Sequence, residues 1–304
     1  MYRNLDEIIA AAKALPNRQR LAVAAAQDQD VLAAVRDAVE WGIVSAILVG
    51  DEEKIKSIAH SVKLDLSKCE ILPESDPVLA ARRAAAMVAA GVADLVMKGK
   101  VGTADILRAV LDKEQGLRTG KLLSHVTALD IEGYDRLFLM TDGAMSIAPD
   151  LGQKVQIVQN AVDVARAMGY VKPKVAALAA VELVNPDMPA TMEAALLAKM
   201  AERGQIKGAL VDGPLALDNA VSHHSAEVKG IVSSVAGQAD ILMVPDIEAG
   251  NVLYKSVVYF ARARVAGVIA GAKAPVVLTS RSDSHQAKLD SIAFSAVIAA
   301  GLNQ

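Results

Sequence analysis

Short apolar runs alternate with segments of helical periodicity along the first third of the chain. The apolar runs, which we expect to be strands, cover residues 20–26, 45–49, 68–72 and 94–97, and the helical segments cover residues 30–42, 52–61 and 76–90. Apolar residues fill most of these runs instead of every second position, a pattern typical of parallel strands buried on both faces. The alternation therefore predicts an α/β fold with helices on both faces of a parallel or mixed sheet.

The middle of the chain departs from this rhythm. Two neighbouring runs, residues 125–132 and 135–140, are separated by Gly133 and Tyr134 and predict a hairpin. Beyond them, the expected helices are residues 152–168 and 191–203, and the expected strands are residues 174–181, 209–211, 241–244, 267–270 and 276–278. We expect two α/β lobes, one formed by residues 1–118 and 268–304 and the other by residues 119–267 inserted between them.

The composition limits the partners of this chain. Hydrophobic residues make up 53% of its 304 positions and charged residues 22%, so the chain can bury a large core. The net charge is −3 and no basic stripe is interleaved with aromatic residues, which argues against nucleic-acid binding. No apolar run approaches the roughly 18 residues of a membrane span, and the N-terminus does not have the pattern of a signal peptide. With a single cysteine, Cys69, we expect a cytoplasmic protein without disulfides.

Residues 274–287 carry the strongest indication of a ligand site. A short apolar run, residues 276–278, leads into a loop that contains Ser280, Arg281 and Asp283, and helical periodicity resumes from about residue 288. In open α/β sheets, ligands bind where strands end and helices begin, and a helix N-terminus and an arginine both favour phosphate there. The segment predicts a site for a small oxyanion. The alternative is an ordinary helix cap beside a solvated arginine.

A second candidate loop begins at Lys98, directly after a predicted strand. Gly99 and Gly102 allow the backbone to approach a ligand closely. Thr103 is expected to cap the next helix, and Arg108 follows about one and a half turns later. The spacing of a P-loop is absent, so an ordinary strand-to-helix loop is the alternative interpretation.

Other polar residues follow expected strands or lie between glycines. Arg118 is flanked by glycines where the lobes are expected to meet, and Asp142 follows a predicted strand. Residues 212–214, Asp-Gly-Pro, predict a sharp turn at a strand end. Asp246 precedes a Gly-Asn pair in which Asn251 is expected to cap a helix.

Several kinds of site are missing from the sequence. No Gly-rich dinucleotide fingerprint follows the first strand, and no GxSxG nucleophile elbow is present. His223 and His224 have no carboxylate at metal-ligand spacing, so we expect them at the solvated surface and expect no metal site.

Six segments, spread in order over nearly the whole chain, resemble the phosphate acetyl/butyryltransferase family and its phosphate butyryltransferase branch in particular. They are residues 21–38, 93–111, 116–129, 185–222, 245–255 and 274–293. The resemblance implies a two-lobed fold of the isocitrate/isopropylmalate dehydrogenase type, with the active site in the cleft between the lobes of a homodimer or dimer-based oligomer. It also implies a reversible reaction in which an acyl-CoA and inorganic phosphate give an acyl phosphate and coenzyme A, without a tightly bound cofactor.

The same resemblance implies roles for individual residues. Arg108 and Arg281 would contact phosphate or coenzyme A, and Ser280 would contact the reacting thioester or phosphate. Asn251 and Lys255 would lie in the cleft segment that begins near Asp246. The further expected binding residues are Lys98, Gly99, Thr103, Arg118 and Asp142.

One departure from the family concerns the base that takes the proton of the coenzyme A thiol. Phosphate acetyltransferases carry an aspartate a few residues after the Ser-Arg pair, where this chain has residues 286–288, Gln-Ala-Lys. That role cannot be transferred, and Asp283, which we favour, and His285 are the nearby alternatives.

The chemistry suits the residues present. Arginines hold phosphate oxygens, backbone amides can stabilise a tetrahedral oxyanion, and direct attack in a ternary complex depends mainly on positioning. Three alternatives remain. They are an acetyl-specific transferase, a metal- and nicotinamide-dependent decarboxylating dehydrogenase on the same fold, and a noncatalytic protein that binds coenzyme A.

Overall fold

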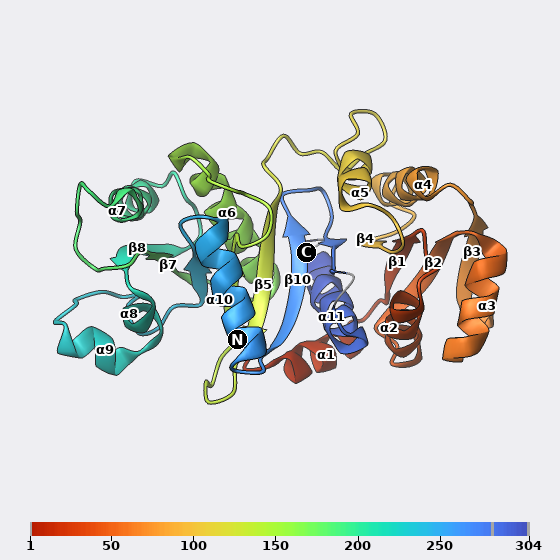
Figure 1. Ribbon diagram of the computed structural model, residues 1–304, viewed down its shortest axis with the longest axis horizontal. Helices are drawn as coiled ribbons and strands as arrows, with labels where there is room; N and C mark the ends of the chain where they lie inside the picture. The colour runs from red at the N-terminus through yellow and green to blue at the C-terminus, as the bar shows by residue number, and fades with distance from the viewer. Residues whose placement is uncertain (1, 281–282, 303–304) are drawn as a thin grey trace. The chain divides into compact units, whose positions relative to one another are not determined.

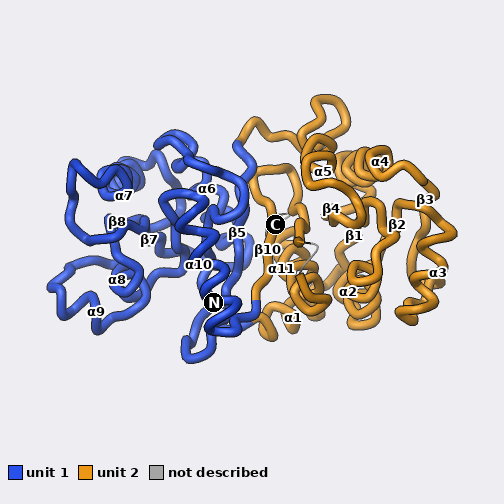
Figure 2. Tube along the Cα trace, in the orientation of Figure 1, with its two compact units in different colours: residues 1–4, 122–264 blue, residues 5–121, 265–304 orange. Residues whose placement is uncertain are grey.

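A computed structural model describes residues 2–280 and 283–302 of the chain (Figure 1). It confirms the expected α/β fold, in which helices flank strands of a mixed sheet. The chain divides into two compact units, named here as in Figure 2. Unit 2 contains residues 5–121 and 265–304, and unit 1 contains residues 1–4 and 122–264.

Unit 2 is built on strands that are mostly parallel. In spatial order they are β3 (Cys69–Pro73), β2 (Val44–Gly50), β1 (Gln19–Ala24), β4 (Leu95–Lys98), β11 (Val276–Val277) and β10 (Arg264–Ala270, whose first residue belongs to unit 1). The first five are parallel, and β10 runs antiparallel to β11. Met97 pairs with Val23 on one side and with Val277 on the other, so the carboxyl ends of β1, β4 and β11 lie at one edge.

Two groups of helices cover the two faces of these strands (Figure 1). On one face α4 (Pro77–Ala89) packs with α5 (Thr103–Val110), and on the other lie α1 (Leu5–Lys13), α2 (Gln29–Glu40), α3 (Glu52–Val62) and α11 (His285–Leu302). A short 3-10 helix, Leu66–Lys68, precedes β3. Asp28, Asp51 and Asp76 cap α2, α3 and α4, and such caps typically contribute about 1 kcal/mol each.

The described part of unit 1 contains five further strands. In spatial order they are β5 (Ser124–Asp130), β6 (Phe138–Thr141), β9 (Ile241–Met243), β7 (Lys174–Leu178) and β8 (Leu210–Leu215). The antiparallel pairing of β5 with β6 confirms the predicted hairpin, and the other pairs are parallel. The helices of this unit are α6 (Leu151–Ala167), α7 (Pro189–Glu202), α8 (Leu217–Val221), α9 (His223–Val228) and α10 (Ile247–Tyr259). Among the described helices, none is both long and apolar enough to cross a membrane.

Two predicted helix caps are wrong. Helix α5 begins at Thr103, but Gly102 occupies the capping position and no side chain caps the helix. Helix α10 begins before Asn251, because Asp246 accepts the backbone N–H of Ala249 at 2.8 Å and caps the helix. Asp and Asn are equally good caps, so the sequence alone does not rank the two positions.

The predicted turn at residues 212–214 is also wrong, because these residues lie inside β8. The register between β7 and β8 shifts between Ala176 and Leu178. Such an irregularity, on the last strand of the order, accommodates a glycine and a proline without ending the strand.

Helix α11 starts at His285, which is earlier than the resumption of helical periodicity near residue 288 suggests. Every residue from 288 to 299 is buried, so the helix has no polar stripe to mark its course in the sequence. Its covered surface includes four polar or charged side chains, Lys288, Asp290, Ser291 and Ser295.

Candidate active site

The candidate residues fall into two groups, one in each unit. Those of unit 2 are Lys98, Gly99, Thr103, Arg108, Arg118, Ser280 and Asp283, and those of unit 1 are Asp142, Asp246, Asn251 and Lys255. Arg281 lies outside the described residues. In unit 2, Lys98 ends β4, Gly99 and Thr103 follow it, and Ser280 and Asp283 follow β11, a neighbouring parallel strand, so these five candidates lie near the carboxyl ends of the two strands. This is the edge at which open α/β sheets bind ligands.

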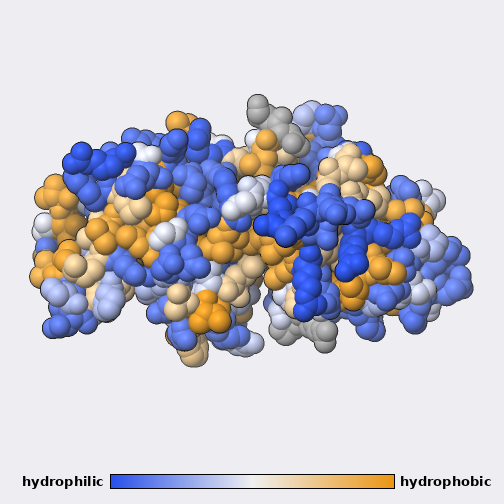
Figure 3. Space-filling view, turned by 90° about the horizontal axis from the view of Figure 1, so that it is seen from above, coloured by the Kyte–Doolittle hydropathy of each residue, from blue (hydrophilic) through white to orange (hydrophobic). Residues whose placement is uncertain are grey.

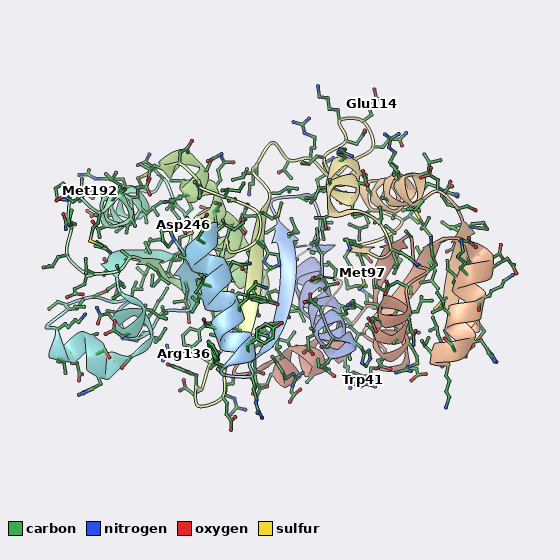
Figure 4. The ribbon with its side chains drawn as sticks, in the orientation of Figure 1. Trp41, Met97, Glu114, Arg136, Met192 and Asp246 are labelled. Atoms are coloured by element: carbon green, nitrogen blue, oxygen red, sulfur yellow. The ribbon has the colours of Figure 1, made fainter. Side chains whose placement is uncertain are left out.

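The loop after β4 lies tightly against the end of β1. Met97, labelled in Figure 4, is followed by Lys98, whose side chain is buried at 6% exposure. A Cβ on Gly99 would lie 2.4 Å from the carbonyl oxygen of Ala25, closer than real Cβ atoms come. The N–H of Gly99 donates to the carbonyl of Ala24 at 2.8 Å, which fixes this approach. Glycine is therefore required at position 99 for the loop to take this path.

Helix α5 carries two candidates on its exposed surface. Thr103 is the first residue of the helix and is exposed. Arg108 lies in its last turn with 76% of its side chain exposed, and its guanidinium pairs with Asp105 at 2.6 Å. An exposed pair of this kind contributes little stability. The guanidinium is thus accessible to a ligand that competes for it.

Arg118 belongs to a segment that is tied to the connection between β10 and β11. The N–H of Lys273 donates to the carbonyl of Leu117 at 2.8 Å, and the hydroxyl of Thr119 donates to the carbonyl of Gly271. Both bonds hold the backbone on either side of Arg118, while its own side chain is exposed.

After β11, Ser280 and Asp283 are joined to each other by hydrogen bonds. The N–H of Ser280 donates to Oδ2 of Asp283 at 2.7 Å, and the N–H of Asp283 donates back to the carbonyl of Ser280 at 3.2 Å. A third residue, Lys288, could not be predicted from the sequence, because α11 has no polar face that would distinguish it. Its ammonium donates to the carbonyls of Ser280 and Asp283.

His285, the second candidate for a base, is attached to helix α2. Its Nε2 lies 2.6 Å from Oδ2 of Asp37, and the other carboxylate oxygen of Asp37 pairs with Arg36 at 2.6 Å. The sequence pattern did not predict this contact, since Asp37 and His285 are distant in the chain.

In unit 1, Asp142 closes the loop that follows β6. Its carboxylate is buried at 2% exposure and accepts the N–H groups of Ala144 and Met145, both at 3.0 Å, and the hydroxyl of Ser146 at 3.1 Å. A carboxylate offers about four acceptor positions, and three are used here. Asp142 therefore shapes this loop.

Helix α10 presents the remaining candidates. Asp246 lies at its N-terminus, as Figure 4 shows, and caps it. Asn251 and Lys255 are exposed one turn apart, so they share a face of the helix. The first turn of α10 touches the Asp142 loop through two glycines, since a Cβ on Gly250 would lie 2.6 Å from the Cα of Gly143. This contact connects the two candidate segments of unit 1.

The thiol of Cys69 and the possible metal ligands of the described residues complete the survey of reactive groups. Burial and the nearby charge of Asp65 raise the pKa of Cys69 to about 11, so its thiol is protonated at neutral pH. Within residues 2–280 and 283–302, no group of three or more His, Cys, Asp and Glu side chains could hold a metal ion. His223 and His224 are exposed, as expected.

Comparison with known proteins gives consistent matches over almost the whole chain. The family described as "Phosphate acetyl/butaryl transferase" matches residues 4–80 and 76–296. The chain is 51% identical over 300 residues to the phosphate butyryltransferase of Clostridium beijerinckii, covering 99% of each chain.

Comparison with solved structures agrees with the family match. A branched-chain phosphotransacylase from Enterococcus faecalis V583 is similar with a TM-score of 0.81 and 33% identity, covering 92% of this chain and 99% of that one. A 4-hydroxythreonine-4-phosphate dehydrogenase from Klebsiella pneumoniae is similar in fold alone, with a TM-score of 0.58 and 13% identity over 93% of this chain and 100% of that one. The second match agrees with the expected dehydrogenase-type fold.

Proposed function

The chain belongs to the phosphate acetyl/butaryl transferase family, and from this premise we propose that it interconverts an acyl-CoA and inorganic phosphate with an acyl phosphate and coenzyme A. Butyryl-CoA or a similar short-chain thioester is the proposed acyl donor. The observation that carries the proposal is the match to a phosphate butyryltransferase over nearly the full length of both chains. Ser280 and Asp283 support it, because their position shortly after the end of β11 suits an anionic ligand.

In the proposed reaction an oxygen of phosphate attacks the thioester carbonyl in a ternary complex. The carbon–sulfur bond breaks from the tetrahedral intermediate, the acyl group remains on phosphate, and coenzyme A leaves as a thiolate that takes up a proton. Positioning and oxyanion donors supply catalysis of this kind. Coenzyme A is a substrate in this scheme, and neither a tightly bound cofactor nor an enzyme nucleophile takes part.

Arg108 and Arg281 contact phosphate or coenzyme A in this proposal, and Ser280 contacts the reacting thioester or phosphate. The exposure of Arg108 supports its role, since a ligand can reach the guanidinium. Asp283 and His285 are the candidate acceptors of the thiol proton. The further binding residues are Lys98, Gly99, Thr103, Arg118, Asp142, Asp246, Asn251 and Lys255.

The further binding residues support the proposal in different ways. Lys98 and Gly99 lie at a strand end next to β11. Asp142 and Asp246 use their carboxylates within their own loops, which supports a role in shaping the binding surface more than direct contact. Two lobes, residues 1–118 with 268–304 and residues 119–267, belong to the same proposal, and the division into compact units supports them.

A cytoplasmic homodimer or dimer-based oligomer completes the proposal. Apolar residues reach the surface of each unit, as the view from above shows (Figure 3). Helix α10 supports a dimer in particular, because Val252 and Tyr259 on it, and Phe260 directly after it, are 65%, 75% and 88% exposed. Exposed apolar side chains gathered in one place are typical of protein interfaces. Light scattering on the purified protein measures the oligomeric state.

A phosphate-dependent assay of coenzyme A release across acyl-CoA chain lengths tests the function. We expect release that requires phosphate, survives EDTA and is fastest for a four-carbon or similar short acyl group. A clear preference for acetyl-CoA would identify the acetyl-specific alternative. Binding of coenzyme A without turnover would identify a noncatalytic protein, and reduction of NAD or NADP with magnesium and a 2-hydroxy diacid would identify a dehydrogenase.

A further inference from the structure

Lys288 is a charged residue in a buried position. It lies in the first turn of α11 with 3% of its surface exposed. Its ammonium donates hydrogen bonds to the carbonyl of Ser280 at 3.3 Å and to the carbonyl of Asp283 at 2.5 Å. These bonds tie the backbone at Ser280 and at Asp283 to the first turn of α11.

The charge of Lys288 has no counterion among the described residues. The two nearest carboxylates along the chain are engaged elsewhere, since Asp283 accepts the N–H of Ser280 and Asp290 accepts the side-chain amide of Gln286. His285, one turn before Lys288, is paired with Asp37. Burying an ammonium without an opposite charge is costly, and carbonyl dipoles offset only part of that cost. A bound anion would supply the missing charge.

A second buried lysine ends the neighbouring strand. Lys98 is 6% exposed and is the last residue of β4. The pairing of Met97 with Val277 brings the end of β4 beside the end of β11, three residues before Ser280, whose carbonyl Lys288 contacts. Two buried lysines thus lie near the carboxyl ends of adjacent parallel strands, where both favour a negative charge.

We propose that Lys288 is a positioning residue of the phosphate site, which supplies a buried positive charge for substrate phosphate and holds Ser280 and Asp283 in place through their carbonyls. This inference rests on the proposed function, because it assigns the residue to that reaction's anion site. It adds a residue for which neither the motif nor the spacing gave a role.

The test separates the charge of Lys288 from its hydrogen bonds. K288Q keeps an amide donor for the loop carbonyls but removes the charge, and K288R keeps the charge. The matched control is K113Q, which removes the charge of an exposed lysine in the same unit. For each variant, thermal unfolding is measured against inorganic phosphate with chloride at equal ionic strength, because a ligand of the folded state raises its melting temperature. Phosphate KM and kcat are measured separately.

We expect K288Q to bind phosphate roughly 10- to 100-fold more weakly than the wild type, the range for a hydrogen bond to a charged group. The phosphate KM should rise by a similar factor, while K288R and K113Q stay close to the wild type. A folded K288Q with wild-type phosphate protection and KM overturns the inference, as does a wild-type protein that phosphate does not protect.

If K288Q does not fold, K288R decides the question. Retained phosphate protection in K288R supports the need for a charge, and its loss in a folded K288R overturns it. Failure of the proposed function gives a different result, namely a wild-type protein that phosphate protects but that releases no coenzyme A from any acyl-CoA.

Discussion

The substitution Gly99→Ala tests whether the loop after β4 depends on its close approach to β1. The added methyl group would meet backbone, since its Cβ would lie 2.4 Å from the carbonyl oxygen of Ala25 and 2.6 Å from that of Ala24. Ordinary contact begins at 3.4 Å, so the two backbone segments must separate by about 1 Å. They are joined by hydrogen bonds, from Gly99 to Ala24 at 2.8 Å and from Lys100 to Ala25 at 2.7 Å, and both would be strained.

Overpacking of this kind costs about 1–3 kcal/mol, and we expect the upper part of that range because backbone cannot rotate away. The melting temperature should then fall by roughly 5–10 °C, given the usual dependence for domains of this size. Lys98 precedes the displaced residue directly, so phosphate-dependent turnover should fall as well.

Gly102→Ala is the matched control in the same loop. Its backbone has φ of −64°, which any residue adopts, and the atom nearest to an added Cβ is the carboxylate of Asp105 at 2.7 Å. That side chain can rotate away, at the cost of an exposed ion pair with Arg108 that contributes little. Calorimetry and the coenzyme A release assay compare the two variants. If Gly99→Ala has the same melting temperature as Gly102→Ala and keeps the wild-type phosphate KM, the reasoning about this close approach is wrong.

Four further predictions follow from the structure. Arg108→Ala should lower turnover at least tenfold and leave the melting temperature almost unchanged, because its ion pair is exposed. A folded variant with wild-type turnover, or one whose melting temperature falls together with its turnover, would contradict this. Asp142→Ala should lower the free energy of unfolding by about 2–4 kcal/mol in urea titration, since two N–H groups lose their acceptor, whereas Asp142→Asn should lose less. Cys69, with a pKa of about 11, should react with iodoacetamide appreciably only above about pH 10 in the folded protein. Asp283→Asn and His285→Gln, compared from pH 6 to 9, should differ in their pH–rate profiles, and an unchanged profile in both would exclude each as the base.

The strands were predictable because buried strands appear in the sequence as continuous runs of apolar residues. In the predicted runs 45–49 and 94–97 every residue after the first is apolar, and they became β2 and β4, which lie inside a covered sheet. The hairpin was predictable for a similar local reason, since two apolar runs flank a Gly-Tyr pair. Features that depend on residues close in the chain could therefore be read directly.

Features that depend on contacts between residues distant in the chain could not be predicted from the sequence. The cap of α10 was misplaced because the sequence does not reveal that Gly250 packs on Gly143 and belongs inside the helix. Lys288 was overlooked because every residue from 288 to 299 is buried, so the helix has no polar stripe, and the sequence does not distinguish a buried lysine from a solvated one. Its two carbonyl partners, on Ser280 and Asp283, are contacts that only the structure reveals.

The contacts of Asp283 and His285 change the balance between the two candidate bases. One oxygen of Asp283 already accepts the N–H of Ser280, so a proton on the other oxygen would weaken the bond that closes the loop. His285 is arranged differently. With Nε2 directed at Asp37, Nδ1 can accept a proton, and the resulting imidazolium would be stabilised by the carboxylate beside it. A histidine oriented by a carboxylate is a recurring arrangement for a general base. From the sequence alone Asp283 is the favoured base, whereas the contacts favour His285 as the acceptor and leave Asp283 as the hydrogen-bond partner of Ser280.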